Sequence, residues 1–112
     1  MESTQAISAL SALAQDTRLE VFRLLMCQLP NAVSAGDLAT KFKVPASTMS
    51  AHLAILARAG LIQSQRRGRT ISYSAKQDGI RDLLAFLVKD CCNGRPNDCN
   101  MLLAAALGQR CA

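Results

Sequence analysis

Residues 34–74 read SAGDLATKFKVPASTMSAHLAILARAGLIQSQRRGRTISYS, and this stretch carries most of the information about the fold. Ser34 and Asp37 form a capping box in which Asp replaces the usual Glu, so a short helix is expected to begin here. That helix should bury Leu38 and end at the turn Lys43-Val44-Pro45. A short helix followed by a tight turn is thus predicted.

A second helix is predicted directly after this turn. It should run from Ala46 or Ser47 to Ala59, with Gly60 in the left-handed position that often follows a helix. Its apolar residues recur at the spacing of one helical face and should point inward: Met49, Leu53 and Leu56. Residues 61–74 then contain alternating polar and apolar side chains, with Gly68 between arginines. This pattern predicts a β-hairpin with Gly68 at its tip.

Helices are also predicted on both sides of this stretch. The first should carry the apolar residues Ile7, Leu10 and Ala14. The second should be capped by Asp16, end at Leu29-Pro30-Asn31, and carry Leu19, Phe22 and Leu25 on one face. The last should be capped by Asp78 and carry the stripe Ile80, Leu83, Leu84, Leu87, Val88 and Cys91. A mainly α chain with the order helix, turn, helix, basic hairpin is typical of a winged helix-turn-helix, whose second helix enters the major groove of DNA.

Charge is distributed unevenly along the chain. Residues 38–77 contain no acid, and their basic residues are Lys41, Lys43, Arg58, Arg66, Arg67, Arg69 and Lys76. The rest of the chain has six basic and eight acidic residues. The middle therefore carries +7 and the two ends −2, which favours contact of the middle with a polyanion. A solvated basic face is the alternative interpretation, and charge alone does not decide between them.

Small polar side chains at the start of the second helix of this pair can reach phosphates and base edges. With its apolar stripe turned inward, that helix presents Ser47, Thr48, Ala51 and His52, with Ser50 between the two faces. Three guanidinium groups at a hairpin tip are costly to pack against anything but phosphate. The predicted DNA-binding residues are therefore Ser47, Thr48, Ser50, His52, Arg66, Arg67 and Arg69. A polar helix face or a single histidine is, by itself, more often ordinary surface.

Size and composition exclude several classes of protein. The 112 residues form one domain, and a domain this short makes a marginal monomer, so dimerisation is expected. No segment approaches the roughly 20 apolar residues of a membrane span, and the first residues lack the features of a signal peptide, so a cytoplasmic location is expected. The sequence has neither a Gly-rich phosphate loop nor paired carboxylates at a site-like spacing. It is therefore not expected to be an enzyme.

Residues 50–61, SAHLAILARAGL, resemble the recognition helix of the ArsR/SmtB family of metal-responsive repressors, and Arg67-Gly68-Arg69 with Tyr73 resembles that family's wing. Residues 13–25, LAQDTRLEVFRLL, resemble its second helix, and the resemblance covers roughly residues 4–92. It implies a homodimer joined through the first and last helices. It also implies that the protein binds double-stranded operator DNA without a cofactor and is released when an inducer binds.

The inducer site departs from the family's founding pattern. The Cys-x-Cys motif often found at the start of the helix-turn-helix is absent, and the only histidine is in the recognition helix, so zinc sensing on the last helix is not expected. The sequence CCNGRPNDC contains the remaining candidates, Cys91, Cys92 and Cys99. Adjacent residues of a continuous helix point about 100° apart. Gly94 and Pro96 break the helix, however, so that Cys99 can fold back beside the pair.

Three thiolates with no obligatory nitrogen or oxygen ligand suit trivalent arsenic or antimony better than tetrahedral zinc. Some family members that look like this chain bind arsenite through three C-terminal cysteines. Residues 1–92 are accordingly predicted to form the DNA-binding and dimerisation domain, and residues 93–112 a tail that completes the inducer site. Cys27 is expected to be a small buried hydrophobe, and Cys111 a spare thiol.

Two alternatives remain open at this point. One is a redox repressor in which Cys27 forms a disulfide with Cys91 or Cys92 under oxidants or persulfides. The other is a small thiol-rich metal-handling protein whose basic surface only provides solubility. Release from DNA by arsenite, release by peroxide, or no DNA binding at all distinguishes the three hypotheses.

Overall fold

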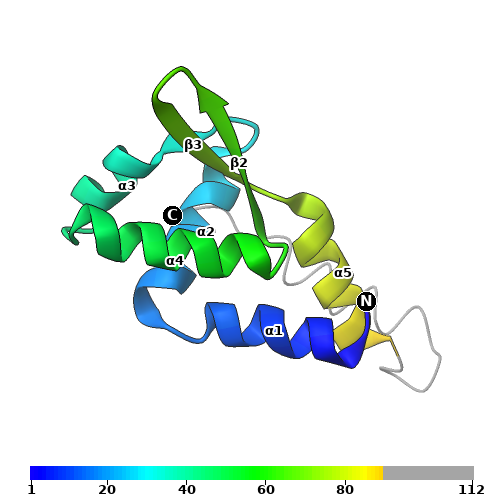
Figure 1. Cartoon of the computed structure of the whole chain (residues 1–112). Coiled ribbons are helices and arrows are strands. Elements are labelled where there is room, and N and C mark those ends of the chain that lie inside the picture. The colour runs from blue at the N-terminus through cyan, green and yellow to red at the C-terminus, as the bar shows by residue number, and fades with distance from the viewer. Residues whose placement is uncertain (90–112) are drawn as a thin grey trace.

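The computed structural model describes residues 1–89, in which a helical body carries a projecting β-hairpin (Figure 1). In chain order the elements are α1 (Ser3–Leu13), α2 (Asp16–Gln28), β1 (Val33–Ser34), α3 (Ala35–Lys41), α4 (Ala46–Arg58), β2 (Ile62–Arg67), β3 (Thr70–Ala75) and α5 (Gln77–Val88). The mainly α winged helix-turn-helix predicted from the sequence is confirmed. The boundary predicted between residues 92 and 93, and the tail 93–112, lie outside the described residues.

Local signals account for the helix-turn-helix. The Ser34 hydroxyl accepts a hydrogen bond of 3.1 Å from the Asp37 backbone N–H, so Ser34 is the N-cap of α3 and this half of the predicted capping box forms. In the turn that follows, Lys43 adopts φ 55, and after α4 Gly60 adopts φ 78 as expected. Helix α4 thus begins and ends where the sequence predicts.

The sheet contains one strand more than the sequence predicts. Strands β2 and β3 form the expected hairpin, but β3 also pairs antiparallel with β1, with Val33 opposite Tyr73 and Ser34 opposite Ser72. The strand order is β1-β3-β2. Because β1 has two residues, it is too short to show an alternating pattern, and the prediction of a hairpin alone was incomplete.

The core lies between the helices and the base of the hairpin. The residues predicted to face inward on α4, Met49, Leu53 and Leu56, are fully buried. They pack in one cluster with Leu25 of α2 and residues of every other helix. This cluster fixes α4 rigidly, so that its opposite face is held at the surface.

Within one protomer the flanking helices bury only part of their predicted apolar stripes. On α1, Ile7 is 66% exposed and Leu10 is also exposed, because the small residues Ala6, Ala9 and Ala12 allow this helix to pack closely on the body. On α2, Leu19 is exposed and Val21 is buried instead. The apolar stripe of α5 divides: Leu83 is buried, whereas Leu84 and Leu87 face outward. Its last predicted member, Cys91, lies outside the described residues.

The predicted caps of α2 and α5 were each misplaced. The Gln15 side chain, long enough to reach back, accepts a hydrogen bond of 2.8 Å from the Arg18 backbone N–H, so it caps α2 and Asp16 lies in the first turn. Helix α5 begins at Gln77 after Lys76, and Asp78 lies in its first turn. Both carboxylates still oppose the positive end of a helix dipole.

Gly79 permits the close approach of α5 to the turn after α4. A Cβ atom at this position would overlap the Gly60 carbonyl oxygen. We therefore expect Gly79→Ala to lower the free energy of unfolding by about 1–3 kcal/mol, the usual cost of overpacking. Gly36→Ala is the matched control, since nothing lies within 4 Å of that position and alanine favours the helix. Urea unfolding at one protein concentration measures both, and equal effects would contradict this account.

Candidate nucleic-acid interface

Helix α4 presents a small polar face to solvent. Ser47, Thr48, Ser50 and Ala51 are exposed, while the three apolar residues of the opposite face are fully buried. Short side chains leave the backbone of this helix accessible to a large partner. The arrangement has the geometry needed to enter a DNA major groove, which admits one α-helix.

His52 lies at the edge of this face, and its side chain is less exposed than the sequence analysis predicts. The side chain is half-buried, and its Nδ1 is 3.4 Å from Nη1 of Arg18 on α2. Burial, and then the positive charge of Arg18, lower the pKa of His52 from its ordinary value. Both effects favour the neutral ring, and the contact with Arg18 joins the ring to α2.

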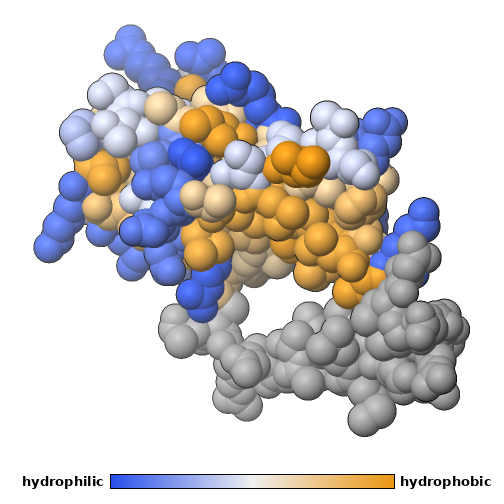
Figure 2. Space-filling model, turned by 90° about the horizontal axis from the view of Figure 1, so that it is seen from below, coloured by the Kyte–Doolittle hydropathy of each residue, from blue (hydrophilic) through white to orange (hydrophobic). Residues whose placement is uncertain are grey.

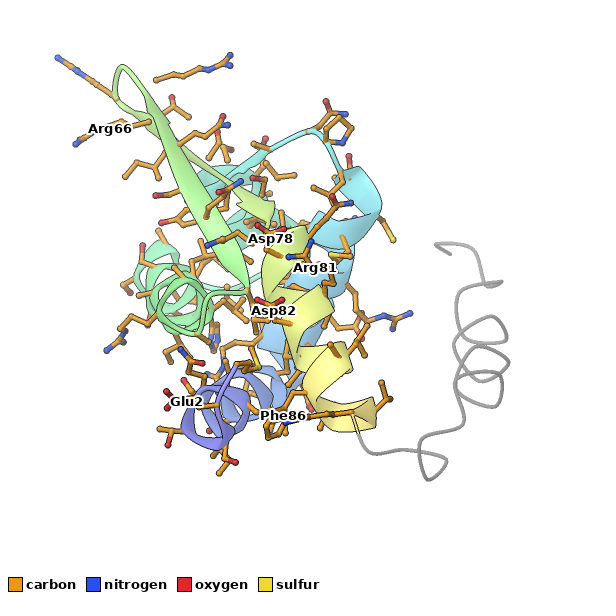
Figure 3. All side chains as sticks on the ribbon, turned by 90° about the vertical axis from the view of Figure 1, so that its right-hand side faces the viewer. Glu2, Arg66, Asp78, Arg81, Asp82 and Phe86 are labelled. Carbon is orange, nitrogen blue, oxygen red and sulfur yellow. The ribbon has the colours of Figure 1, made fainter. Side chains whose placement is uncertain are left out.

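The hairpin tip forms a wing with three exposed arginines. Arg67 pairs with Thr70 across a two-residue turn, in which Gly68 adopts φ 62 as a tight hairpin requires. Arg66 and Arg67 are adjacent in β2, so their side chains point to opposite faces of the ribbon. Arg66 lies on the part of the hairpin that projects beyond the helices (Figure 3). The wing thus carries cations on both faces and, through Arg69, at its tip.

The ion pairs of the described residues lie outside the acid-free stretch 38–77. Glu20 pairs with Arg23 on α2, and Arg81 pairs with Asp78 and Asp82 on α5. Within residues 1–89, the cations of α4 and the wing have no carboxylate partner. Their charge is therefore available for phosphate groups.

A separate face of the molecule is apolar. Ile7 and Leu10 of α1 and Leu84 and Leu87 of α5 are exposed, with exposed fractions between 40% and 66%. Figure 2 shows the apolar surface gathered on the side where α1 lies. We call these four residues the apolar face. Large apolar patches on small soluble domains commonly mark protein contacts.

The structure describes one of the five cysteines. Cys27 is exposed near the end of α2 and is disulfide-bonded, so the expectation of a buried hydrophobe was wrong. The cause is its position on the side of α2 away from Val21 and Leu25, the buried residues of that helix. The other cysteines of the chain lie outside the described residues: Cys91, Cys92, Cys99 and Cys111.

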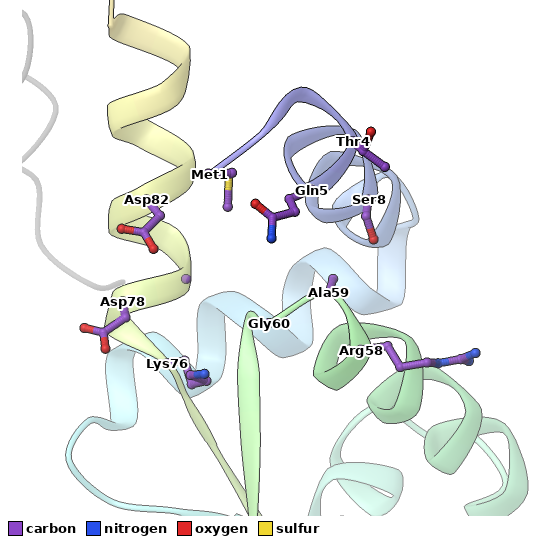
Figure 4. Close-up of a pocket in the computed structure, with 11 residues that line it drawn as sticks. Met1, Thr4, Gln5, Ser8, Arg58, Ala59, Gly60, Lys76, Asp78 and Asp82 are labelled. Atoms are coloured by element: carbon purple, nitrogen blue, oxygen red, sulfur yellow. The ribbon is translucent and has the colours of Figure 1, made fainter.

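A hollow of about 600 Å³ lies between α1, the end of α4 and the start of α5 (Figure 4). Its lining combines apolar residues with charged residues of both signs, which are Arg58, Lys76, Asp78 and Asp82. Among the described residues, neither cysteine nor histidine lines it. Across residues 1–89, no group of three or more His, Cys, Asp or Glu side chains is placed to hold a metal. The predicted thiol site lies outside the described residues.

Comparison with known proteins agrees with the fold and the DNA-facing geometry. Residues 13–65 match a family model described as a helix-turn-helix domain. The HTH-type transcriptional regulator YgaV of Escherichia coli is 36% identical over 85 residues, covering 74% of this chain and 82% of the relative. The transcriptional repressor SdpR of Bacillus subtilis is 34% identical, covering 70% and 88%. The transcriptional activator HlyU of Vibrio cholerae is 29% identical, covering 76% of each chain.

Solved structures define the family more closely. An ArsR-like transcriptional regulator from Rhodococcus is 27% identical with a TM-score of 0.68, covering 92% of this chain and 90% of that one. HlyU from Vibrio cholerae is 29% identical with a TM-score of 0.63, covering 82% and 99%. The chain belongs to the ArsR-like family of winged helix-turn-helix transcriptional regulators. Its relatives are regulators of transcription rather than enzymes, in agreement with the sequence analysis. No helix of residues 1–89 is long and apolar enough to span a membrane.

Proposed function

We propose that this protein is a cytoplasmic transcriptional repressor that binds operator DNA as a homodimer, and that trivalent arsenic or antimony at Cys91, Cys92 and Cys99 releases it. The DNA-binding part of the proposal rests on one observation. Most of the acid-free stretch 38–77 folds into α4 and the wing, which form one unit at the surface. Exposed Ser47 and Thr48 of α4 belong to this unit, as do the arginines of the wing, which have no carboxylate partner within residues 1–89. Helix α4 reads the bases, and the wing contacts the phosphate backbone.

The apolar face supports the homodimer. Ile7 on α1 and Leu87 on α5 are large side chains that are more than half exposed in one protomer. A second copy of the same face would cover them in a twofold-symmetric contact. A related winged helix-turn-helix domain, Mb0332 from Mycobacterium bovis, is described as homodimeric and is 29% identical with a TM-score of 0.63.

The inducer part rests on donor chemistry. Arsenous acid exchanges its three hydroxyl groups for three thiolates, and the thiol protons leave with the hydroxyls as water. Cys91, Cys92 and Cys99 supply three such thiols within nine residues of sequence. Soft sulfur donors select soft, thiophilic centres over hard cations. Because these cysteines follow α5, the bound metalloid acts on the end of a helix that carries part of the apolar face.

A second candidate is a thiol redox regulator, favoured by the disulfide of Cys27. In this mechanism Cys27 and Cys91 or Cys92 lose two electrons and two protons to an oxidant such as hydrogen peroxide, which is reduced to water. The likeness to HlyU, one structure of which is described as reduced HlyU, is compatible with this chemistry. The two candidates differ in their requirement for Cys27 and Cys99.

The DNA-binding part is tested by the salt dependence of binding. DNA bound by the wild-type protein is first selected from a random pool, with and without arsenite. Replacing Arg67 and Arg69 by Ala should then weaken binding to all sequences and flatten the plot of log affinity against log salt. The expected change is about two units for each bound protomer, because each phosphate contact contributes roughly −0.9.

The matched control replaces Arg23 and Arg81, two exposed arginines that already have carboxylate partners, by Ala. This double variant removes the same charge and should leave the slope unchanged. Equal slopes for the two double variants would show that the wing does not contact DNA. Failure to select any DNA would overturn the DNA-binding function itself.

A further inference from the structure

One guanidinium group connects three helices around the DNA-facing surface. Arg18 lies in the first turn of α2 and is half-buried. Its Nε donates a hydrogen bond of 2.7 Å to the backbone carbonyl of Ala12, at the end of α1. Its Nη1 lies 3.4 Å from Nδ1 of His52, in the middle of α4. The side chain is thus held from one side by α1 and contacts α4 from the other.

We propose that Arg18 is a positioning residue that holds the His52 ring with its proton on Nε2, so that this N–H donates a hydrogen bond to DNA. The inference rests on the proposed DNA-binding function. It extends that function by assigning a role to a residue that does not belong to the exposed face of α4.

The tautomer follows from the chemistry of the pair. An arginine side chain has only donors and remains protonated in proteins. A ring nitrogen that faces it must therefore offer a lone pair, which places the His52 proton on Nε2. The lowered pKa of His52 agrees, because both burial and the Arg18 charge disfavour the doubly protonated ring. Arg18 thereby selects one of the two neutral tautomers.

The position of Nε2 supports contact with DNA. Within residues 1–89 this nitrogen has no hydrogen-bond partner, and no buried side-chain nitrogen or oxygen lacks one. Nε2 therefore reaches solvent. His52 follows the exposed Thr48 by four residues, so the two side chains are neighbours on one face of α4. A fixed N–H at this place can donate to an acceptor atom of a base edge or a phosphate.

NMR spectroscopy of the free protein tests the tautomer without DNA. His52 is the only histidine of the chain, so its ring nitrogens give one assigned pattern in a long-range ¹H–¹⁵N experiment. The expected pattern has Nε2 protonated, and a pKa below 6.5. Arg18→Met keeps the apolar stem but removes the charge and the donors, so it should raise the pKa and mix the tautomers. Arg23→Met, on the exposed side of the same helix, is the matched control and should change neither.

The DNA-binding test uses a double-mutant cycle on the selected duplex. Arg18→Met and His52→Ala should each lower the affinity about tenfold, and the double variant should bind no worse than His52→Ala. A change in the selected sequence with His52→Ala indicates a base acceptor, and uniform weakening indicates a phosphate. If Arg18→Met does not fold, Arg18→Lys replaces it, since one ammonium group cannot reach both partners in the geometry of the guanidinium.

Two results would overturn the proposal: a wild-type ring protonated on Nδ1, or independent, multiplying losses from the two substitutions. These results are distinct from failure of the proposed function. If wild-type protein binds no DNA but shows the Nε2–H tautomer, the proposed DNA contact is wrong, whereas the proposed orientation of the ring by Arg18 remains valid.

Discussion

Replacing Leu84 by Asp should convert the dimer to a monomer and lower operator affinity by about 10²–10⁴-fold, the range gained when two linked sites bind together. Leu84 is 40% exposed on α5 and belongs to the apolar face. In the proposed dimer it would be buried, so an aspartate there would place an unpaired charge in the contact. In the monomer the same side chain reaches water, so folding itself should survive. The two recognition helices would then no longer be held one helical turn of DNA apart, roughly 34–36 Å.

Sedimentation velocity and DNA binding together measure this effect. Leu19→Asp is a matched control, because Leu19 of α2 is also 40% exposed and lies outside the apolar face. That variant should remain dimeric and bind operator normally. A Leu84→Asp protein that stays dimeric with normal affinity would place the dimer contact elsewhere.

The second large effect concerns induction. Serine at Cys91, Cys92 or Cys99 should each give a repressor that binds operator normally but no longer responds to arsenite. Removing one of three sulfur ligands weakens the site strongly. Changing an operator from almost fully occupied to almost free needs a difference in affinity between the two forms on the order of 10⁴-fold. DNA binding is expected to persist because these cysteines lie outside the acid-free stretch.

Cys27→Ser and Cys111→Ser provide the controls for induction. Under reducing conditions both should still be released by arsenite, as measured by gel shift. Because Cys27 is disulfide-bonded and only the redox mechanism requires it, its replacement distinguishes the two candidate mechanisms. If Cys27→Ser abolishes the response while Cys99→Ser leaves it intact, the redox mechanism replaces the three-thiol site.

Elements with short-range signals could be predicted from the sequence almost to the residue. The Ser34 N-cap and the glycines at positions 60 and 68 depend only on neighbouring residues, and all three act as expected. The polar face of α4 could also be predicted. The apolar stripe that contains Met49 marks the buried side of this helix, and the polar face lies opposite.

Features that depend on distant contacts could not be predicted. The face of α1 that packs on the body is one such feature, because Ala6 and Ala9 are buried whereas Ile7, a member of the predicted stripe, is exposed. The contact of Arg18 with His52 joins residues 34 positions apart, and no local sequence pattern predicts it. The one available signal was that both residues fall within the two stretches that resemble the family. Strand β1 is defined only by its pairing with β3.

The most direct test of the central claim is the fluorescence anisotropy of a labelled operator duplex bound by the reduced wild-type dimer. Arsenite is added to one sample and hydrogen peroxide to another, at constant salt. The account predicts that arsenite lowers the anisotropy to the value of free DNA, whereas peroxide leaves the complex intact. Unchanged anisotropy with arsenite, together with a fall on peroxide that a dithiol reductant reverses, would contradict it.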